Sequence, residues 1–175
     1  MKQINKHNPA PPRLDTYIKE GDYVLVSNYH REKERDENVR MARFLGEMTR
    51  EPVYVLPHIQ PTLKNADLLR KELLPSGVKK NKNPDFYYKG RFVDGKSITV
   101  YDLKEADRAK RNIQKKIKVG LKQADDILLE IPESYPLSWI NNAVQGELNS
   151  LSHNHIIYVK YCDKLLIFKK IKQPH

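Results

Sequence analysis

The dipeptide Asp94-Gly95, set between two β-rich runs, is the feature that most restricts how this chain can fold. Residues 85–92 and 97–103 are rich in aromatic and β-branched side chains, which favour strands. Asp-Gly favours the positive φ angles that both central positions of a two-residue hairpin turn require. The pattern therefore predicts two antiparallel strands that turn at Asp94-Gly95.

That turn fixes a register in which two carboxylates and one lysine share a face of the hairpin. Asp85 is expected opposite Lys104, and Tyr87 opposite Asp102. Directly opposed residues share a face, as do residues two apart on one strand, so Asp85, Asp102 and Lys104 converge. A loop longer by one residue would shift the register and scatter these side chains. The expected cluster depends on the turn.

The rest of the chain alternates short β-rich runs with amphipathic stretches, which predicts an α/β domain with a central mixed sheet. The polar and proline-rich start, residues 1–20, is interpreted as a flexible arm, and residues 21–175 as a single domain. Helices are expected at 33–49, 66–73, 106–123 and 136–148, and further strands at 23–27, 52–57, 127–131, 156–161 and 165–169.

Charge and composition narrow the classes of partner and compartment. The 32 basic residues exceed the 22 acidic ones by 10, which favours a polyanionic partner, nucleic acid first and an anionic membrane surface second. The single cysteine, Cys162, excludes an internal disulfide and a cysteine-based zinc site. No apolar run reaches the roughly 18–20 residues of a membrane span, and residues 1–14 lack the apolar core of a secretion signal. A cytoplasmic site of action is expected, and delivery into a target cell by another protein stays open.

The expected cluster on the hairpin has the chemistry of a phosphodiesterase. Asp85 and Asp102 offer hard oxygen ligands to Mg²⁺ or Mn²⁺, with Zn²⁺ as a further alternative. A bound metal acidifies a water and neutralises charge on the scissile phosphate. Lys104 would orient that water and stabilise the transition state. The alternative is an exposed cross-strand ion pair, worth a few tenths of a kcal/mol.

These residues resemble the signature of the PD-(D/E)xK nuclease superfamily: Pro84-Asp85, a hairpin, and then Asp102-Leu103-Lys104. The resemblance implies a three-layer α/β/α fold, divalent-metal catalysis and a nucleic-acid substrate. It also implies that a glutamate on the helix preceding the core strands joins the metal site. Glu37 lies four residues before Met41, on the expected apolar stripe, and Glu34 is a second candidate. The alternative for Glu37 is an interaction with the helix dipole.

The order of three short blocks is similar to that in the C-terminal toxin domains of contact-dependent growth-inhibition systems. The blocks are residues 83–86, 102–104 and 122–125. Many of those toxins cut tRNA, so the resemblance implies a tRNase and an acidic immunity protein as partner. It places Gln123 near the site, holding substrate or water; a solvent-facing Gln123 is the alternative. A DNase of a phage or mobile element and an inactive nucleic-acid-binding module remain rival interpretations.

Basic residues flank the expected site on both sides. Such residues engage the phosphate backbone, although they equally suit the solvated face of an amphipathic helix. The candidate nucleic-acid contacts are Lys82, Lys115, Lys118 and Lys122.

Overall fold

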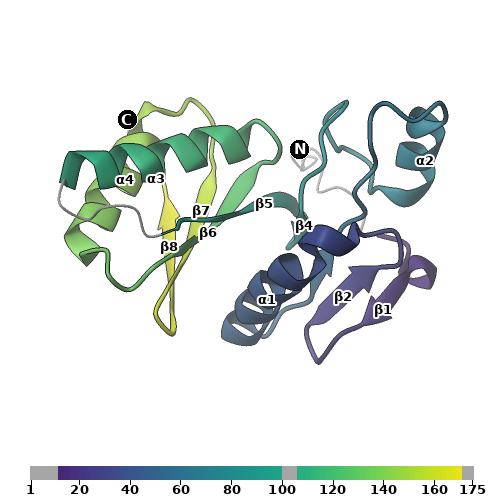
Figure 1. Ribbon diagram of the computed structural model, residues 1–175, viewed down its shortest axis with the longest axis horizontal. Helices are drawn as coiled ribbons and strands as arrows, with labels where there is room; N and C mark the ends of the chain where they lie inside the picture. Colours follow the sequence, from purple (N-terminus) through teal and green to yellow (C-terminus); the bar gives the residue numbers. More distant parts are fainter. Residues whose placement is uncertain (1–11, 100–105, 171–175) are drawn as a thin grey trace, which may run out of the picture. The chain divides into compact units, whose positions relative to one another are not determined.

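The computed structural model describes residues 12–99 and 106–170, and the chain divides into two compact units, Met1–Val93 and Asp94–His175. Eight strands and four α-helices occur in the described residues (Figure 1), and strand pairing is both parallel and antiparallel. The expected α/β class with a mixed sheet is therefore confirmed. None of the described helices is long and apolar enough to cross a membrane.

The first unit contains a sheet whose strands are neighbours in chain order, and its only parallel pair among the described strands is β2 with β3. Helix α1 connects these two strands and packs on both, as a parallel connection requires. The elements are η1 (Leu14–Thr16), β1 (Tyr17–Lys19), β2 (Val24–Ser27), α1 (Glu32–Thr49), β3 (Val53–Val55), α2 (Ala66–Leu73), β4 (Phe86–Tyr88) and β5 (Arg91–Ser97).

The end of the expected N-terminal arm has regular structure. Residues 14–16 form a 3-10 turn, and Tyr17–Lys19 pairs antiparallel with β2. This edge strand precedes the first expected strand, at 23–27, and extends the sheet by one strand. Residues 1–11 lie outside the described part of the chain.

The hairpin turns at Lys89-Gly90, and the predicted turn at Asp94-Gly95 is wrong. Lys89 and Gly90 have φ angles of 47° and 77°, the positive values that a two-residue hairpin turn requires. The observed cross-strand pairs are Phe86↔Val93, Tyr87↔Phe92 and Tyr88↔Arg91. Asp94 and Gly95 lie inside β5 instead.

Burial explains why the earlier turn is used. Phe86, Tyr88 and Val93 are all buried, and the observed register puts them on one face of the hairpin. A turn at Asp94-Gly95 would instead place Lys89 and Gly90 inside a strand. The register that predicted the pairs of Asp85 with Lys104 and of Tyr87 with Asp102 is therefore not formed: Tyr87 pairs with Phe92, and residues 102 and 104 lie outside the described part of the chain.

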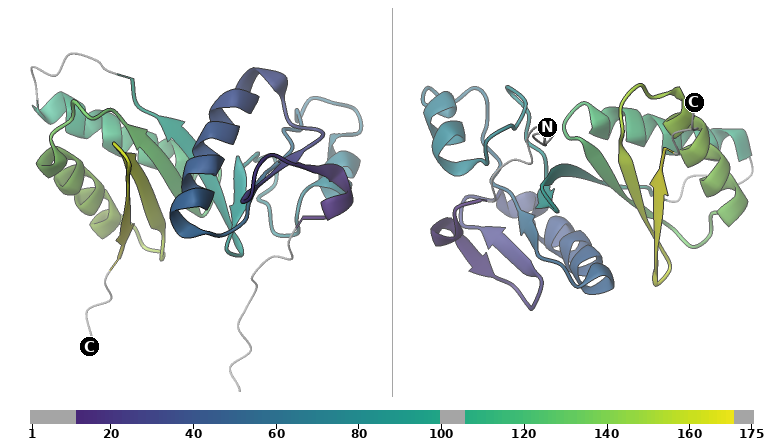
Figure 2. Two further views of the ribbon diagram at one scale, coloured as in Figure 1. Left: turned by 90° about the horizontal axis from the view of Figure 1, so that it is seen from below. Right: turned by 180° about the vertical axis from the view of Figure 1, so that it is seen from behind.

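The second unit packs two helices on one face of a three-stranded segment (Figure 2). Strand β6 pairs parallel with β7, β7 pairs antiparallel with β8, and the backbone N–H of Ile98 donates to Glu130 O in β6 at 2.9 Å. The elements are α3 (Ala106–Leu121), β6 (Asp126–Ile131), α4 (Leu137–Ser150), β7 (Ile156–Tyr161) and β8 (Lys164–Lys169).

The core of this unit follows the periodicities of its elements. Alternate residues of the strands point toward the helices, and they pack against helix residues that are three or four positions apart. Burial of such side chains stabilises the unit by roughly 1.5–3 kcal/mol each. The core includes Ile113, Ile117, Ile127, Leu129, Ile140, Val144, Leu148, Ile157 and Val159.

Candidate functional site

Asp85 lies in a polar cluster of the first unit, directly before β4. Its Oδ1 accepts a hydrogen bond from Asn38 Nδ2 at 3.3 Å, and Asn38 is only 6% exposed. The same amide nitrogen lies 3.1 Å from His30 Nε2. Asn38 therefore connects the half-buried Asp85 carboxylate to an imidazole through its two N–H groups.

His30 is held neutral and in one tautomer by this arrangement. Its Nδ1 lies 2.9 Å from the backbone oxygen of Arg31, an acceptor only, so Nδ1 carries the proton and donates it. Nε2 is then the acceptor for the Asn38 amide. Burial lowers the pKa of His30 below its usual 6.5, against the opposing effect of the nearby Asp85 and Glu34 carboxylates.

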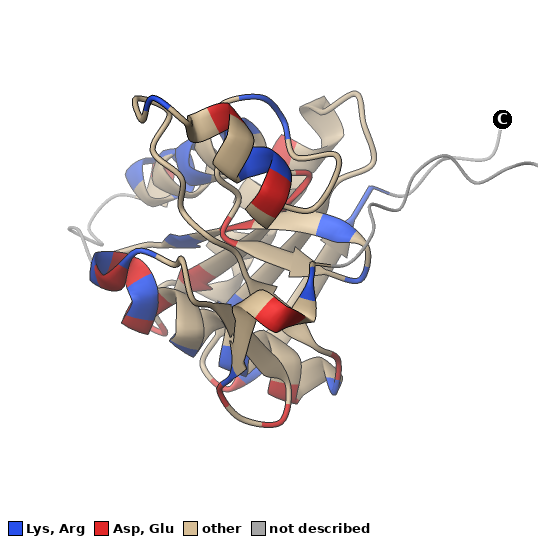
Figure 3. Cartoon of the chain, turned by 90° about the vertical axis from the view of Figure 1, so that its right-hand side faces the viewer, with Lys and Arg blue, Asp and Glu red and all other residues tan. Residues whose placement is uncertain are grey.

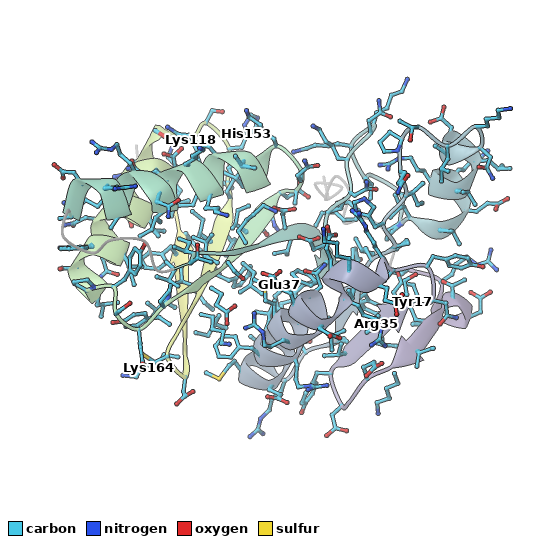
Figure 4. The ribbon with its side chains drawn as sticks, in the orientation of Figure 1. Tyr17, Arg35, Glu37, Lys118, His153 and Lys164 are labelled. Atoms are coloured by element: carbon cyan, nitrogen blue, oxygen red, sulfur yellow. The ribbon has the colours of Figure 1, made fainter. Side chains whose placement is uncertain are left out.

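Glu34, the second candidate glutamate on α1, interacts with two histidines near Asp85. Its Oε2 lies 3.8 Å from His58 Nδ1, and its charge acts on His30, as that of Asp85 does. Glu37 is exposed, so its expected place on the buried stripe is wrong (Figure 4). The buried face of α1 begins at Asn38 instead.

Side-chain hydrogen bonds hold the loop that delivers Asp85. Asn83 Nδ2 donates to Ile59 O at 3.0 Å, and Asn83 Oδ1 accepts from Ile59 N at 3.3 Å and from Arg70 Nη1 at 2.9 Å. Arg70 belongs to α2, a helix with acidic and basic residues on its surface (Figure 3), and also donates to the backbone oxygens of Lys79 and Lys82. Asn83 thus links the loop before β4 to the loop that contains Ile59.

In the second unit, Asp94 and Lys96 form a mostly buried ion pair on β5. Asp94 is 2% exposed, and the ammonium of Lys96 contacts its Oδ2. Lys96 Nζ also donates to Gly95 O at 2.9 Å. A Cβ on Gly120 of α3 would lie 2.9 Å from Asp94 Oδ2, so a glycine is needed where this helix passes the carboxylate. Residues 94–96 form an acid-x-lysine sequence.

The remaining predicted catalytic residues are Asp102, Lys104 and Gln123. Asp102 and Lys104 lie outside the described residues. Gln123 is half-buried in the turn after α3, where its backbone N–H donates to Gly120 O at 2.7 Å.

The predicted nucleic-acid lysines differ in their surroundings. Lys118 projects from α3 (Figure 4), and its Nζ lies 3.5 Å from Oε2 of the buried Glu147, so its charge is already partnered. Lys115 and Lys122 are exposed, and Lys82 is half-buried. Lys115 also lines a pocket on α3.

The donor set suits a hard cation that keeps water ligands. Among the described residues no group of three or more His, Cys, Asp and Glu side chains could hold a metal ion. Mg²⁺ characteristically uses one or two carboxylates together with waters and substrate phosphates, whereas a structural zinc site needs four protein ligands. Asp85 in the first unit and Asp94 in the second each carry carboxylate oxygens of the kind that the first type of site uses.

Sequence reasoning missed the roles of Asn38, Asn83, Asp94 and Lys96. The acid-x-lysine sequence at 94–96 was readable, because it follows Asp85 on the next strand of a short hairpin. This sequence was overlooked because Asp94-Gly95 was assigned to the hairpin turn. The two asparagines had no sequence signal, since their function depends on partners distant along the chain.

No protein-family model, curated protein or solved structure matches this chain.

Proposed function

We propose that the chain is a metal-dependent nuclease of the PD-(D/E)xK type whose motif is Pro84-Asp85 followed by Asp94-Gly95-Lys96. The observation that carries the proposal is the turn at Lys89-Gly90. In that register Val93 is paired with Phe86, and the next residue along each strand is Asp94 and Asp85 respectively. Asp85 and Asp94 are therefore the residues directly next to the Phe86–Val93 pair, one on each strand.

The chemistry of Asp94 and Lys96 supports this assignment. Burying an ion pair costs desolvation energy that its attraction barely offsets, so a buried pair on a strand calls for a role beyond stability. An acid and a lysine two residues apart share a face of a strand, as water activation beside a carboxylate requires. In this proposal they replace Asp102 and Lys104.

Each residue has a defined task in the proposed hydrolysis. A divalent cation, when bound, neutralises charge on the scissile phosphate and acidifies a water. Asp85 and Asp94 supply carboxylate oxygens, and Lys96 orients the attacking water as the bond from phosphorus to the leaving oxygen breaks. Asn38 fixes the rotamer of Asp85, and neutral His30 fixes Asn38.

The helix carboxylate of the proposed site is Glu34 rather than Glu37. Glu34 and Asp85 both act on the ionisation of His30, which requires them to share one neighbourhood in the first unit. The three-layer arrangement of the superfamily is part of the same proposal.

RNA, and tRNA in particular, is the proposed substrate, with DNA as the alternative. The net charge of +10 supports a nucleic-acid substrate of either kind. The preference for tRNA follows from the resemblance to contact-dependent toxin domains, of which this proposal keeps the blocks at residues 83–86 and 122–125. An acidic immunity protein is the matching proposed partner.

Cleavage of total tRNA and of plasmid DNA, with Mg²⁺, Mn²⁺ or EDTA, tests the proposal. We expect cleavage that EDTA abolishes and that Asp85→Asn and Lys96→Met each reduce by about 100-fold or more, the usual effect of losing one charge-stabilising group. Asp163→Asn, at the exposed β7–β8 turn, is the matched control and should leave the rate unchanged.

Two results would overturn the mechanism. One is cleavage that persists in EDTA, and the other is full activity of both Asp85→Asn and Lys96→Met. Nucleic-acid binding without cleavage under any metal condition would instead identify an inactive binding module of this fold.

A further inference from the structure

A cationic pocket lies on α3 and is separate from the residues assigned to hydrolysis. Its volume is about 310 Å³. Ala109 and Tyr135, both buried, contribute to its walls. The remaining lining residues are polar or positively charged: Arg108, Arg111, Asn112 and Lys115.

The three cations of this pocket lie on one face of the helix. Arg108, Arg111 and Lys115 are separated by three and four residues, the spacing of neighbours on an α-helix. All three are exposed at the opposite side of α3 from the buried Ile113 and Ile117. Their charges therefore point into one space outside the core.

These cations have no acidic partner among the described residues, and in this they differ from Lys118. Lys118, one turn further on, is paired with the buried Glu147. No ion pair in the described part of the chain involves Arg108, Arg111 or Lys115. Like charges held close together without a counter-charge favour binding of an anion.

We propose that this pocket binds a phosphate group of the nucleic-acid backbone. Arg111 and Arg108 provide planar donor forks that match phosphate oxygens, Lys115 adds a point charge, and Asn112 adds neutral hydrogen-bonding capacity. The pocket carries no base-specific donor pattern, so it positions the strand without reading sequence. This deepens the proposed function, because it assigns a substrate contact outside the hydrolytic residues.

Equilibrium binding without hydrolysis tests the proposal separately from nuclease activity. A fluorescein-labelled single-stranded RNA oligonucleotide is titrated with the full chain in EDTA, and anisotropy is measured over a series of NaCl concentrations. The pocket variant is Arg108→Ala/Arg111→Ala/Lys115→Ala. The control variant, Lys19→Ala/Lys164→Ala/Lys169→Ala, removes the same charge from exposed strand positions.

We expect the pocket variant to lower the magnitude of the slope of log K against log salt by about 0.7, the contribution of one single-strand phosphate contact. The control variant should keep the wild-type slope. Equal losses in the two variants would overturn the proposal in favour of diffuse charge attraction. An unchanged slope in the pocket variant would overturn it as well.

A second arm separates a backbone phosphate from a free anion. Inorganic phosphate is titrated into both proteins by calorimetry. Phosphate binding that the pocket variant loses, combined with an unchanged RNA slope, would identify a small-anion site and overturn the proposal. A pocket-dependent slope in a protein that cleaves nothing would retain this inference and refute the nuclease, so the two failures are distinguishable.

Discussion

Replacing Gly120 with alanine should destabilise the second unit, whereas the same change at Gly146 should stabilise it. A Cβ at Gly120 would lie 2.2 Å from Ile127 Cδ1 and 2.9 Å from Asp94 Oδ2. Ile127 is fully buried, so its side chain has no free space in which to move away. A Cβ at Gly146 would find Gln114 Nε2 at 3.6 Å, an ordinary contact.

The magnitude follows from comparing these two sites. Alanine gains about 0.5–1 kcal/mol over glycine in a helix at each position. Overpacking costs typically about 1–3 kcal/mol and applies only to Gly120→Ala. The gain in helix propensity is the same in both variants, so their free energies of unfolding should differ by the overpacking cost alone, about 1–3 kcal/mol.

Thermal and urea unfolding measure this difference directly. For a chain of this length it corresponds to roughly 2–12 °C between the two midpoints, with Gly146→Ala the higher. Gly120→Ala should also lose nuclease activity per folded molecule, because the added methyl group displaces the Asp94 carboxylate. A Gly120→Ala variant as stable as Gly146→Ala would refute the close approach of α3 to Asp94.

Two further predictions concern the first unit. Asn83→Ala removes the hydrogen bonds to both backbone groups of Ile59 and to Arg70, and should lower the free energy of unfolding by about 1–3 kcal/mol, whereas Asn141→Ala at an exposed site should change it by less than about 0.5 kcal/mol. Equal urea midpoints for the two variants would contradict this. The pKa of His30 is lowered in the folded state, so neutral His30 stabilises the folded protein. This contribution to the free energy of unfolding is complete above pH 6.5 and is lost as the pH falls from there through the folded-state pKa. The loss is no more than about 1.4 kcal/mol per pH unit. His30→Asn should remove that part of the pH dependence and the exposed His153→Asn should not; identical stability profiles of all three proteins between pH 7 and 5 would refute it.

Regular elements with long periodic patterns were predictable from the sequence. The helix expected at 66–73 has the observed bounds, and the one expected at 33–49 begins one residue earlier. In the longer of the two, apolar residues recur at helical spacing over several turns. Local pattern and tertiary packing agree in these segments.

The hairpin was mispredicted because two Gly-containing dipeptides compete for the turn. Asp94-Gly95 has the stronger local preference, but Lys89-Gly90 allows Phe86, Tyr88 and Val93 to be buried together. Asp94 can enter the core because Lys96 neutralises it and Gly120 leaves room for it. Neither compensation is visible from neighbouring residues.

The place of Glu37 was mispredicted for a related reason. The apolar stripe of α1 was centred using Met41, Leu45 and Met48, but Met48 is 46% exposed. Val39 and Gly46 are buried instead, which turns the packed face away from Glu37. Gly46 gave no apolar signal, although a Cβ there would lie 2.7 Å from Tyr23 Cβ.

The most direct test of the account compares Asp94→Asn with Asp102→Asn in the same metal-dependent cleavage assay. Both changes are isosteric, and circular dichroism establishes that each variant is folded. We expect Asp94→Asn to lower the cleavage rate by about 100-fold or more and Asp102→Asn to stay within a factor of about two of the wild type. An active Asp94→Asn together with an inactive Asp102→Asn would contradict the assignment of Asp94-Gly95-Lys96 as the catalytic motif.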